Sequence, residues 1–352
     1  MAGFFILVQP VHGNGYKLIA LRVADDKDKK MAQRYAALMG ALVADAASMG
    51  THWIYSPERI RSLQSLPHFP FIEPDAHHYE GVEGYYAHDK LTAGELTIYG
   101  EWLALYIRLL SEPDVETHRV QQEILDYFGP GGEFIGYVDT PTKALLLSLF
   151  SLPPEDWPED SGSDDDQNPA LCAVPALVAL KMPSEKLESE IDRIVGVTHQ
   201  NEQALACAKA FASALNEALR SRRMDPVLNV LKVKCPEPIM EKIEQARGLS
   251  GDVNDLSHVL SIANSACHLA DSLPMAAWIL QNSSSYTEAI LNNIAVGGDS
   301  CGRGILVGAI AGACYGFGDT QGIPISWVTT LQCGEALAED IEQLLHSAGG
   351  AF

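Results

Sequence analysis

Positive charge is scarce in this sequence. The chain has 352 residues, of which 24 are Lys or Arg and 46 are Asp or Glu, so its formal net charge is −22 at pH 7. Nucleic acids and anionic lipids are bound mainly through Lys and Arg, which displace counterions from phosphate groups. The composition therefore argues against a nucleic-acid partner and against binding to an anionic membrane surface.

Long hydrophobic runs are also missing. No stretch reaches the roughly 18 consecutive apolar residues that a membrane-spanning helix needs. The opening segment, MAGFFILVQPVHGNGYKLIALRV, has a short apolar run that ends at Pro10, with no basic start and no small-residue cleavage site. We expect residues 1–30 to form a poorly ordered leader or an extra strand, followed by a single domain over residues 31–348.

Cysteine motifs are absent as well. The seven cysteines are scattered, odd in number and include no CxxC pair, so they fit neither a disulfide framework nor a zinc site. This usage is typical of a reducing compartment, and we expect a cytoplasmic protein. No pattern in the chain indicates an oligomeric state.

The sequence does contain helical periodicity. Residues 31–49, MAQRYAALMGALVADAASM, are rich in good helix formers, and their small residues would let a second helix approach closely. No segment alternates convincingly as a strand would, so we predict an all-α fold. Further helices are expected over residues 95–110, 170–180, 187–198 and 202–222, and a functional loop rich in His and Tyr over residues 67–88.

A glycine-rich stretch, GGDSCGRG, lies at residues 297–304. Its first two glycines predict a tight turn, and Asp299 or Ser300 is expected to cap the helix that follows. Beyond the cap, glycines recur every four residues and form one ridge on that helix, against which another helix can pack at short range. The ridge comprises Gly304, Gly308, Gly312 and Gly316.

The first turn of this late helix contains Cys301 and Arg303. A helix N-terminus presents free N–H groups and a partial positive charge, which would bind an anion and stabilise a thiolate at Cys301. Arg303 would add positive charge at the same place. On the alternative interpretation, Cys301 is an inert buried thiol and Asp299 is only a helix cap.

Several stretches, in chain order, resemble the motifs of the ADP-ribosylglycohydrolase family. They are GALVADAASMG at 40–50, QNPALCAVPALVAL at 167–180, VTHQNEQALACAKAF at 197–211 and SYTEAILNNIAVGGDSCGRGILVGAIAGACYG at 285–316. The resemblance runs from about Met31 to Leu345. It implies a compact orthogonal helical bundle, and it implies that active members hold two magnesium ions, bind ADP-ribose and cleave its glycosidic link to a protein or small molecule.

The resemblance breaks down at the metal motifs. The family's hydrolases carry Thr-Asp-Asp-Thr at one helix start and Gly-Gly-Asp-Thr-Asp-Thr at the late one, whereas this chain has TIYG at 97–100 and GGDSCG at 297–302. Only Thr97 and Asp299 remain as partial metal ligands. Mg²⁺ prefers octahedral oxygen coordination, and a cysteine sulfur suits it poorly, so a complete two-magnesium site is not expected.

Four shorter patterns resemble a divergent branch of the family that includes the J-crystallins and selenoprotein J. They are THWIY at 51–55, YYAH at 85–88, LTIYGEW at 96–102 and GGDSCGR at 297–303. In selenoprotein J, selenocysteine stands at the position of Cys301. This resemblance implies that Cys301 is a reactive thiol.

Other residues are expected to line the same cleft. His52 is a candidate acid, base or ligand, although a lone histidine is more often structural. Glu101 is a candidate general base, although the helix dipole alone favours a glutamate there. Substrate contacts are expected from Tyr99, Tyr86, Ser300 and Arg303, the tyrosines by stacking on adenine or ribose. Weaker candidates are His88, Lys90, Asp139 and Thr140, the last two of which also fit the cap of a helix beginning near Pro141.

Three functions are compatible with these residues. The first is a hydrolase of an ADP-ribose-type or other glycosidic bond, with Asp299, Cys301, His52 and Glu101 around the reacting bond. The second is a non-catalytic, crystallin-like relative that keeps the bundle for stability or for ligand binding. The third is a thiol redox protein that uses Cys301, with Cys267 or Cys314 approaching it in space.

Overall fold

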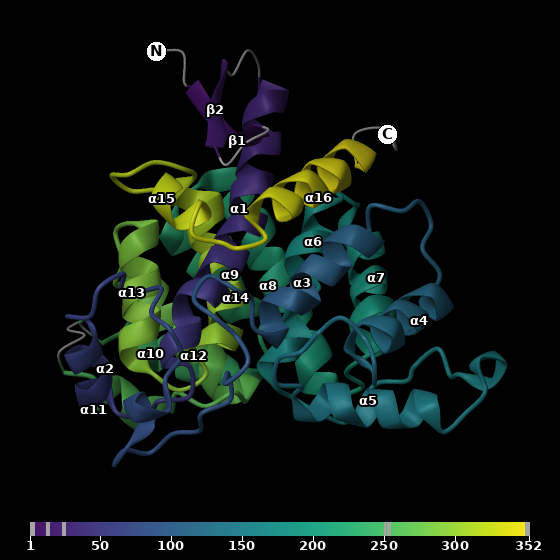
Figure 1. Cartoon of the computed structure of the whole chain (residues 1–352), viewed down its shortest axis with the longest axis horizontal. Helices are drawn as coiled ribbons and strands as arrows, with labels where there is room; N and C mark the ends of the chain where they lie inside the picture. The colour runs from purple at the N-terminus through teal and green to yellow at the C-terminus, as the bar shows by residue number, and fades with distance from the viewer. Residues whose placement is uncertain (1–3, 12–14, 23–25, 250, 252–254, 349–352) are drawn as a thin grey trace.

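The structure is a computed structural model that describes residues 4–11, 15–22, 26–249, 251 and 255–348. Over these residues its regular structure is helical apart from one N-terminal hairpin, which confirms the predicted all-α fold (Figure 1). Within the same ranges, no helix is both long enough and apolar enough to cross a membrane.

Most helices follow one another after short connections, whereas longer connections that contain only 3-10 turns span residues 64–97 and 151–173. The helices are α1 (Asp26–Ser48), α2 (Pro57–Leu63), α3 (Ile98–Leu109), α4 (Thr117–Phe128), α5 (Thr140–Phe150), α6 (Val174–Ala179), α7 (Ser184–Gly196), α8 (Glu202–Ser221), α9 (Met224–Lys234), α10 (Glu237–Arg247), α11 (Ser257–Ile262), α12 (Leu269–Gln281), α13 (Tyr286–Val296), α14 (Ser300–Tyr315), α15 (Ile325–Val328) and α16 (Gly334–Ser347). Short 3-10 helices span Met49–Thr51, Ala76–Tyr79, Pro154–Asp156 and Asn168–Leu171. The expected helices are present, but α1 begins earlier than predicted, and the stretch 170–180 contains the end of a 3-10 turn followed by α6.

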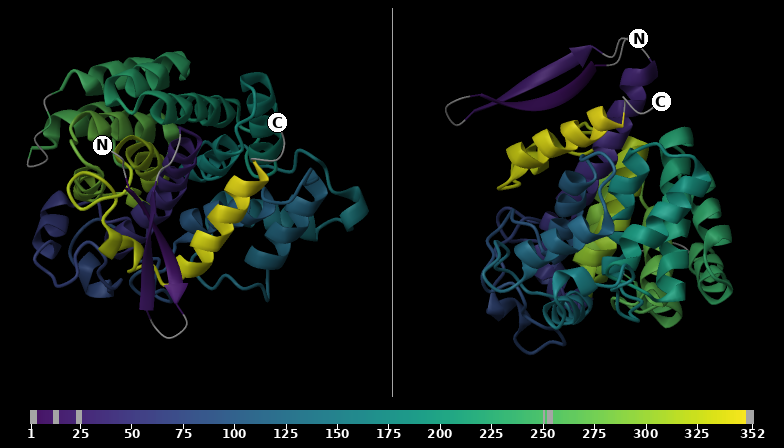
Figure 2. Two further views of the ribbon diagram at one scale, coloured as in Figure 1. Left: turned by 90° about the horizontal axis from the view of Figure 1, so that it is seen from above. Right: turned by 90° about the vertical axis from the view of Figure 1, so that its right-hand side faces the viewer.

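The N-terminal segment contributes the only β-strands among the described residues. Strands β1 (Phe4–Val11) and β2 (Gly15–Arg22) pair antiparallel in a two-stranded sheet. Figure 2 shows this hairpin outside the helical bundle, next to α16. The extra strand considered for residues 1–30 is therefore a hairpin, whereas residues 1–3, 12–14 and 23–25 lie outside the described part of the chain.

Helices α1 and α14 form the centre of the bundle and pack at backbone distance (Figure 1). A Cβ atom built on Gly308 would collide with the backbone oxygen of Gly40, and one on Gly312 with that of Ala36. At Gly304 a Cβ would lie 3.4 Å from the oxygen of Ala44, which is ordinary contact. Three of the predicted ridge glycines thus face α1, whereas the fourth, Gly316, has a positive φ of 69° and ends the helix. Close approach of the two helices explains why glycine is tolerated despite its low helix propensity.

A tight turn precedes α14, as the paired glycines predict. Gly297 and Gly298 have φ angles of +77° and +65°, which residues with a side chain rarely adopt. Asp299 is the N-cap, and its Oδ1 accepts a hydrogen bond from the Gly302 amide at 3.2 Å. The sequence alone left the cap open between Asp299 and Ser300, and the structure assigns it to Asp299.

The loop after α1 is tied to this turn by backbone hydrogen bonds. The amide of Trp53 donates to the carbonyl of Gly298 and the amide of Gly298 donates to the carbonyl of Ile54, both at 2.8 Å. The amide of Tyr85 in turn donates to the carbonyl of Trp53 at 3.1 Å. These links bring the segments around residues 52 and 88 to the N-terminal end of α14, so distant parts of the chain meet at one site.

Candidate active site at the N-terminus of α14

Asp299 is the centre of a fully buried polar network. Its Oδ1 accepts hydrogen bonds from Nε2 of His52 at 2.8 Å and from the Gly302 amide at 3.2 Å. Its Oδ2 accepts from Nδ2 of Asn168 at 2.7 Å and from the hydroxyl of Tyr99 at 3.2 Å. A carboxylate offers about four acceptor positions, so these four donors occupy all of them.

The donors hold Asp299 in its ionised form. Burial raises the pKa of Asp299, but the hydrogen bonds from His52 and Asn168 and the charge of Arg303 outweigh it, so the pKa lies below its ordinary value. The site therefore contains a fixed negative charge beneath the surface, in surroundings where such a charge acts strongly on neighbouring groups.

His52 connects Asp299 to a second histidine. Nδ1 of His52 lies 2.7 Å from Nε2 of His88, and both rings are almost completely buried. The His52 ring is stacked on Trp53 with a centroid separation of 4.3 Å, whereas the His88 ring lies nearly in its plane, at its edge, with a centroid separation of 5.0 Å. The side chains of Asp299, His52 and His88 thus form a continuous hydrogen-bonded chain whose middle ring packs on Trp53.

Thr97 and Asp45 form a neighbouring pair. The Thr97 hydroxyl donates to Oδ1 of Asp45, and the Thr97 amide donates to Oδ2 of Asp45 at 2.7 Å. The Thr97 oxygen also caps α3 by accepting from the Tyr99 amide at 3.3 Å. Burial raises the pKa of Asp45 to about 7, against the opposing effect of the Thr97 hydrogen bonds.

Cys301 lies next to this pair and is fully buried. Its thiol donates to the backbone oxygen of Asp45 at 3.5 Å. Burial, followed by the nearby carboxylates of Asp45 and Asp299, raises the pKa of Cys301 well above its ordinary value. The thiolate expected from the helix N-terminus is therefore disfavoured, because desolvation and two acidic neighbours outweigh the helix dipole.

The sequence model of one protein family, ADP-ribosylglycohydrolase, matches residues 26–351 of this chain. The chain belongs to the ADP-ribosylglycohydrolase family. Crystallin J1A of Tripedalia cystophora is 24% identical over 92% of this chain and 98% of the crystallin, and Crystallin J1B of the same organism is 23% identical over 88% and 95%. ADP-ribosylarginine hydrolase Tri1 of Pseudomonas putida is 25% identical, over 43% of this chain and 38% of Tri1.

A solved structure supports the same fold. It is described as an ADP-ribosylglycohydrolase-related protein complex and has a TM-score of 0.67 to this chain, with 18% identity over 91% of this chain and 99% of its own. The predicted family and its helical bundle are therefore confirmed. The comparisons do not test the likeness to selenoprotein J, which stays a prediction.

The residues at the family's metal position do not fit a two-magnesium centre. All four acceptor positions of Asp299 receive protein donors, and the Thr97 hydroxyl is bonded to Asp45. Tyr99, at the position of a family carboxylate, places a hydrogen-bond donor on Asp299 where a cation would need an oxygen ligand. Among the described residues, no group of three or more His, Cys, Asp or Glu side chains is arranged to hold a metal ion. The side chains at this position therefore do not support magnesium-dependent chemistry.

Arg303 and Ser300 support the turn and make no contact that points to a substrate. The buried Arg303 guanidinium donates to the backbone oxygens of Gly297 at 2.9 Å and Asn293 at 3.0 Å, and to the Asn293 side chain at 2.8 Å. The Ser300 carbonyl accepts from the Asn293 amide group at 2.7 Å. The predicted positive charge is thus present near Asp299, but the N–H groups of Arg303 donate to Asn293 and to the carbonyl of Gly297 in the turn.

Two further candidates lie outside the network. Glu101 accepts a hydrogen bond from the Tyr127 hydroxyl at 2.7 Å and lines a different groove of about 310 Å³, and burial raises its pKa. Tyr86 packs against Tyr79 and donates to the Pro74 carbonyl at 3.3 Å. Lys90 and Thr140 are exposed, whereas Asp139 caps α5 through the Thr142 amide at 2.9 Å, as predicted.

Two residues of the site were not singled out from the sequence. Asn168, which binds Asp299, and Asp45, which binds Thr97, both lie within the stretches that carry the family resemblance. For Asp45 the available signal was a carboxylate between two alanines of a predicted core helix, since such a side chain needs a partner. Asn168 follows the polar Gln167 and gave no such signal. The partner itself is not encoded locally, because Asn168 and Asp299 are 131 residues apart.

Aromatic side chains surround the outer end of the network. Trp53 lies 5.2 Å from Tyr137 and 5.8 Å from Tyr85, measured between ring centroids. Tyr85 is 56% exposed, so this cluster reaches the surface. Lys143 lies over the Tyr137 ring at 4.7 Å. The cluster Trp53, Tyr85 and Tyr137, called the aromatic mouth below, connects the surface to His52 through Trp53.

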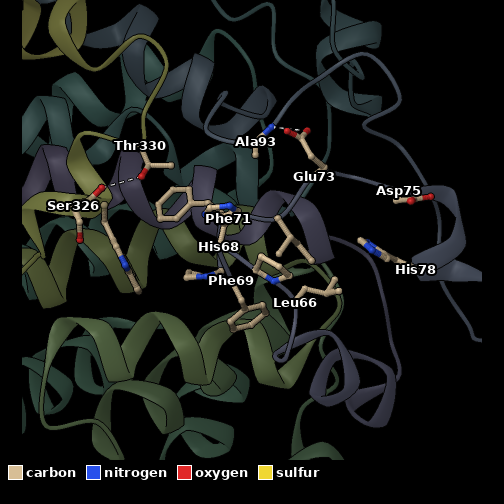
Figure 3. A pocket seen from close by; sticks show the side chains of 14 residues that line it. Leu66, His68, Phe69, Phe71, Glu73, Asp75, His78, Ala93, Ser326 and Thr330 are labelled. Atoms are coloured by element: carbon tan, nitrogen blue, oxygen red, sulfur yellow. Dashed lines mark hydrogen bonds between the residues drawn. The ribbon is translucent and has the colours of Figure 1, made fainter. Parts of the chain in front are cut away.

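A separate groove of about 490 Å³ lies between the loop 66–78 and the segment 326–330 (Figure 3). Its walls include Phe69, Phe71 and Trp327, with His78 and Asp75 at one side. None of the predicted site residues lines it, and it shares no side chain with the Asp299 network.

Proposed function

We propose that this protein is a hydrolase of an ADP-ribose-type glycosidic bond that works without the two-magnesium centre of its family. The single observation that carries this proposal is the ionised, fully buried Asp299, bonded to His52 beneath the aromatic mouth. Burying a charge in this way is costly, and perturbed titratable groups in such positions are typical of functional sites.

The proposed reaction is glycosidic hydrolysis. Water adds to the anomeric carbon, the bond from that carbon to the nitrogen or oxygen of the leaving group breaks, and the leaving group keeps the electron pair and takes a proton. Positive charge develops on the sugar ring during this step. The fixed negative charge of Asp299 would favour such charge without reorganisation. The planar rings of Trp53 and Tyr137 would hold a base or sugar at the surface.

Family membership and the relationship to an ADP-ribosylarginine hydrolase support the substrate class. One competing function has an observation in its favour. Two relatives that align with about nine-tenths of the chain are crystallins, and the network is closed to solvent, which fits a non-catalytic protein that keeps the bundle. Of the two partners considered for Cys301, Cys314 is excluded, since it is 13 residues away along α14, or about 20 Å at the rise of a helix. The redox function with Cys267 is disfavoured by the raised pKa of Cys301, which keeps its thiol protonated.

Calorimetric titration with ADP-ribose, in EDTA and in Mg²⁺, tests the proposal. We expect the same affinity in both buffers, and an affinity at least about tenfold weaker for Asp299→Asn, which corresponds to about 1.4 kcal/mol. Because Asp299→Asn also threatens the fold, Tyr85→Ala at the exposed mouth is the second variant. Phe150→Ala, which removes an equally exposed ring elsewhere, is its control. Absence of binding to the wild type in both buffers would favour the non-catalytic function.

A further inference from the structure

The hydrogen bonds that link Asp299, His52 and His88 determine which nitrogen of each imidazole carries its proton. Ionised Asp299 can only accept, so Nε2 of His52 must be protonated and donate to it. In neutral His52, Nδ1 is then an acceptor, and the proton between the two rings belongs to Nε2 of His88. His88, when neutral, is left with a bare Nδ1.

Burial favours a neutral His88 ring. Burial, and then the neighbouring His52, lowers the pKa of His88 well below its ordinary value. The buried Arg303 lies near Asp299 as a cation and helps to keep that carboxylate ionised. The His88 ring is therefore expected to be neutral at neutral pH, with its proton on Nε2.

Of the four ring nitrogens of His52 and His88, three already have hydrogen-bond partners. Both nitrogens of His52 have partners, which leaves His52 no atom for a substrate. Nδ1 of His88 has no hydrogen-bond partner among the described residues, although the side chain is 2% exposed. A buried acceptor without a protein donor is available to a water or a ligand group. The adjacent Asp89 and Lys90 are exposed, so His88 is one residue from the surface.

We propose that His88, and not His52, is the proton acceptor of this site, with His52 and Asp299 as the residues that position it. This inference rests on the proposed function. Nδ1 of His88 takes a proton from the attacking water as the oxygen of that water bonds to the anomeric carbon and the glycosidic bond breaks. The imidazolium is stabilised by Asp299 through His52, and its proton then passes to the leaving group, which restores the resting chain.

Two-bond ¹H–¹⁵N correlation spectra of the ¹⁵N-labelled full chain test the arrangement directly. We expect both His52 and His88 as Nε2–H tautomers, assigned from the spectra of His52→Gln and His88→Gln. A His88 ring protonated at Nδ1 would overturn the proposal, because that atom would then be a donor. This readout requires no substrate and no turnover.

The kinetic test compares two substitutions of His88. In His88→Gln the amide nitrogen lies near the place of Nε2 and still donates to His52, but no base replaces Nδ1. We expect a loss of kcat of about 100-fold or more, with KM and ADP-ribose affinity unchanged and the melting temperature retained. His88→Ala also loses the donor to His52, so we expect it to be destabilised as well.

The outcomes separate this inference from the function on which it rests. An active wild type with an equally active His88→Gln would leave the function standing and overturn the role of His88. A wild type that hydrolyses no ADP-ribosyl bond would overturn both.

Discussion

The hydroxyl of Tyr99 donates to Oδ2 of Asp299 at 3.2 Å, and both side chains are buried. Tyr99 stands where active members of the family carry a carboxylate for magnesium. A donor in place of a ligand oxygen satisfies the remaining acceptor position of Asp299 from within the protein. Together with the donors from His52, Asn168 and the Gly302 amide, this contact leaves Asp299 no free acceptor position for a metal ion.

Magnesium is therefore expected to leave stability unchanged. A ligand that binds only the folded state at about 100 times its Kd adds about 2.7 kcal/mol to the free energy of unfolding. We expect no such gain when the thermal unfolding midpoint is compared in millimolar Mg²⁺ and in EDTA. A rise in the unfolding midpoint with Mg²⁺ that Asp299→Asn abolishes would show that Mg²⁺ binds at Asp299, which contradicts the absence of a fitting magnesium site.

Cys301 is expected to be unreactive in the folded protein. Its burial and raised pKa keep the thiol protonated, whereas Cys267 and Cys333 are partly exposed. Brief treatment with iodoacetamide followed by peptide mass spectrometry should label Cys267 and Cys333 first and Cys301 only after unfolding. Preferential labelling of Cys301 in the native state would instead support the redox function.

The contact between α1 and α14 predicts different effects at two glycines. A Cβ on Gly308 collides with the Gly40 backbone, whereas a Cβ on Gly304 makes ordinary contact 3.4 Å from the Ala44 oxygen. We expect Gly308→Ala to lower the free energy of unfolding by about 1–3 kcal/mol, because the helices must move apart. Gly304→Ala should be neutral or stabilising by up to about 1 kcal/mol, since alanine favours helix. Urea denaturation measures both, and equal losses would rule out the packing explanation.

Asp139 predicts a specific dependence of stability on pH. Burial raises its pKa to about 6 in the folded protein, above its ordinary value of 3.8. Its contribution to stability is thus fully present below about pH 4 and is lost as the pH rises through 6. Asp139→Asn keeps an acceptor for the Thr142 amide but cannot ionise.

The comparison of Asp139 with asparagine gives the size of this effect. Between pH 4 and pH 7, the wild type should lose up to roughly 3 kcal/mol relative to Asp139→Asn, from the shift of about two pKa units. Urea denaturation of both proteins over this range measures the difference, in which other titrating groups cancel. A constant difference across the range would show that Asp139 does not titrate as described.

Patterns in neighbouring residues were sufficient to predict the backbone elements that support the site. The paired glycines, the Asp299 cap and the glycine ridge follow from backbone geometry and helix packing, both of which are written in consecutive residues. The ridge prediction failed only at Gly316, because a glycine at the end of a helix is a stop signal as readily as a packing surface.

Patterns in neighbouring residues were insufficient to predict pKa values and hydrogen-bond partners that depend on residues far away in the sequence. The helix dipole predicted a thiolate at Cys301, but burial, and then the carboxylate of Asp45, 256 residues away in the chain, raises the pKa of the thiol instead. Glu101 lies one turn after Thr97, so its place in the cleft was a reasonable prediction, yet its carboxylate is bonded to Tyr127 in another groove. His52 was identified, but its role changed once both nitrogens proved to be engaged.

Release of ADP-ribose from an arginine-linked ADP-ribosyl peptide in EDTA tests the central claim most directly. The account predicts release by the wild type at a rate that Mg²⁺ does not change. It also predicts a loss of about 100-fold or more in Asp299→Asn, and full activity in the exposed control Asp89→Asn. Release that stops in EDTA and returns with Mg²⁺, or that is unaffected in Asp299→Asn, would contradict a metal-free site built on this carboxylate.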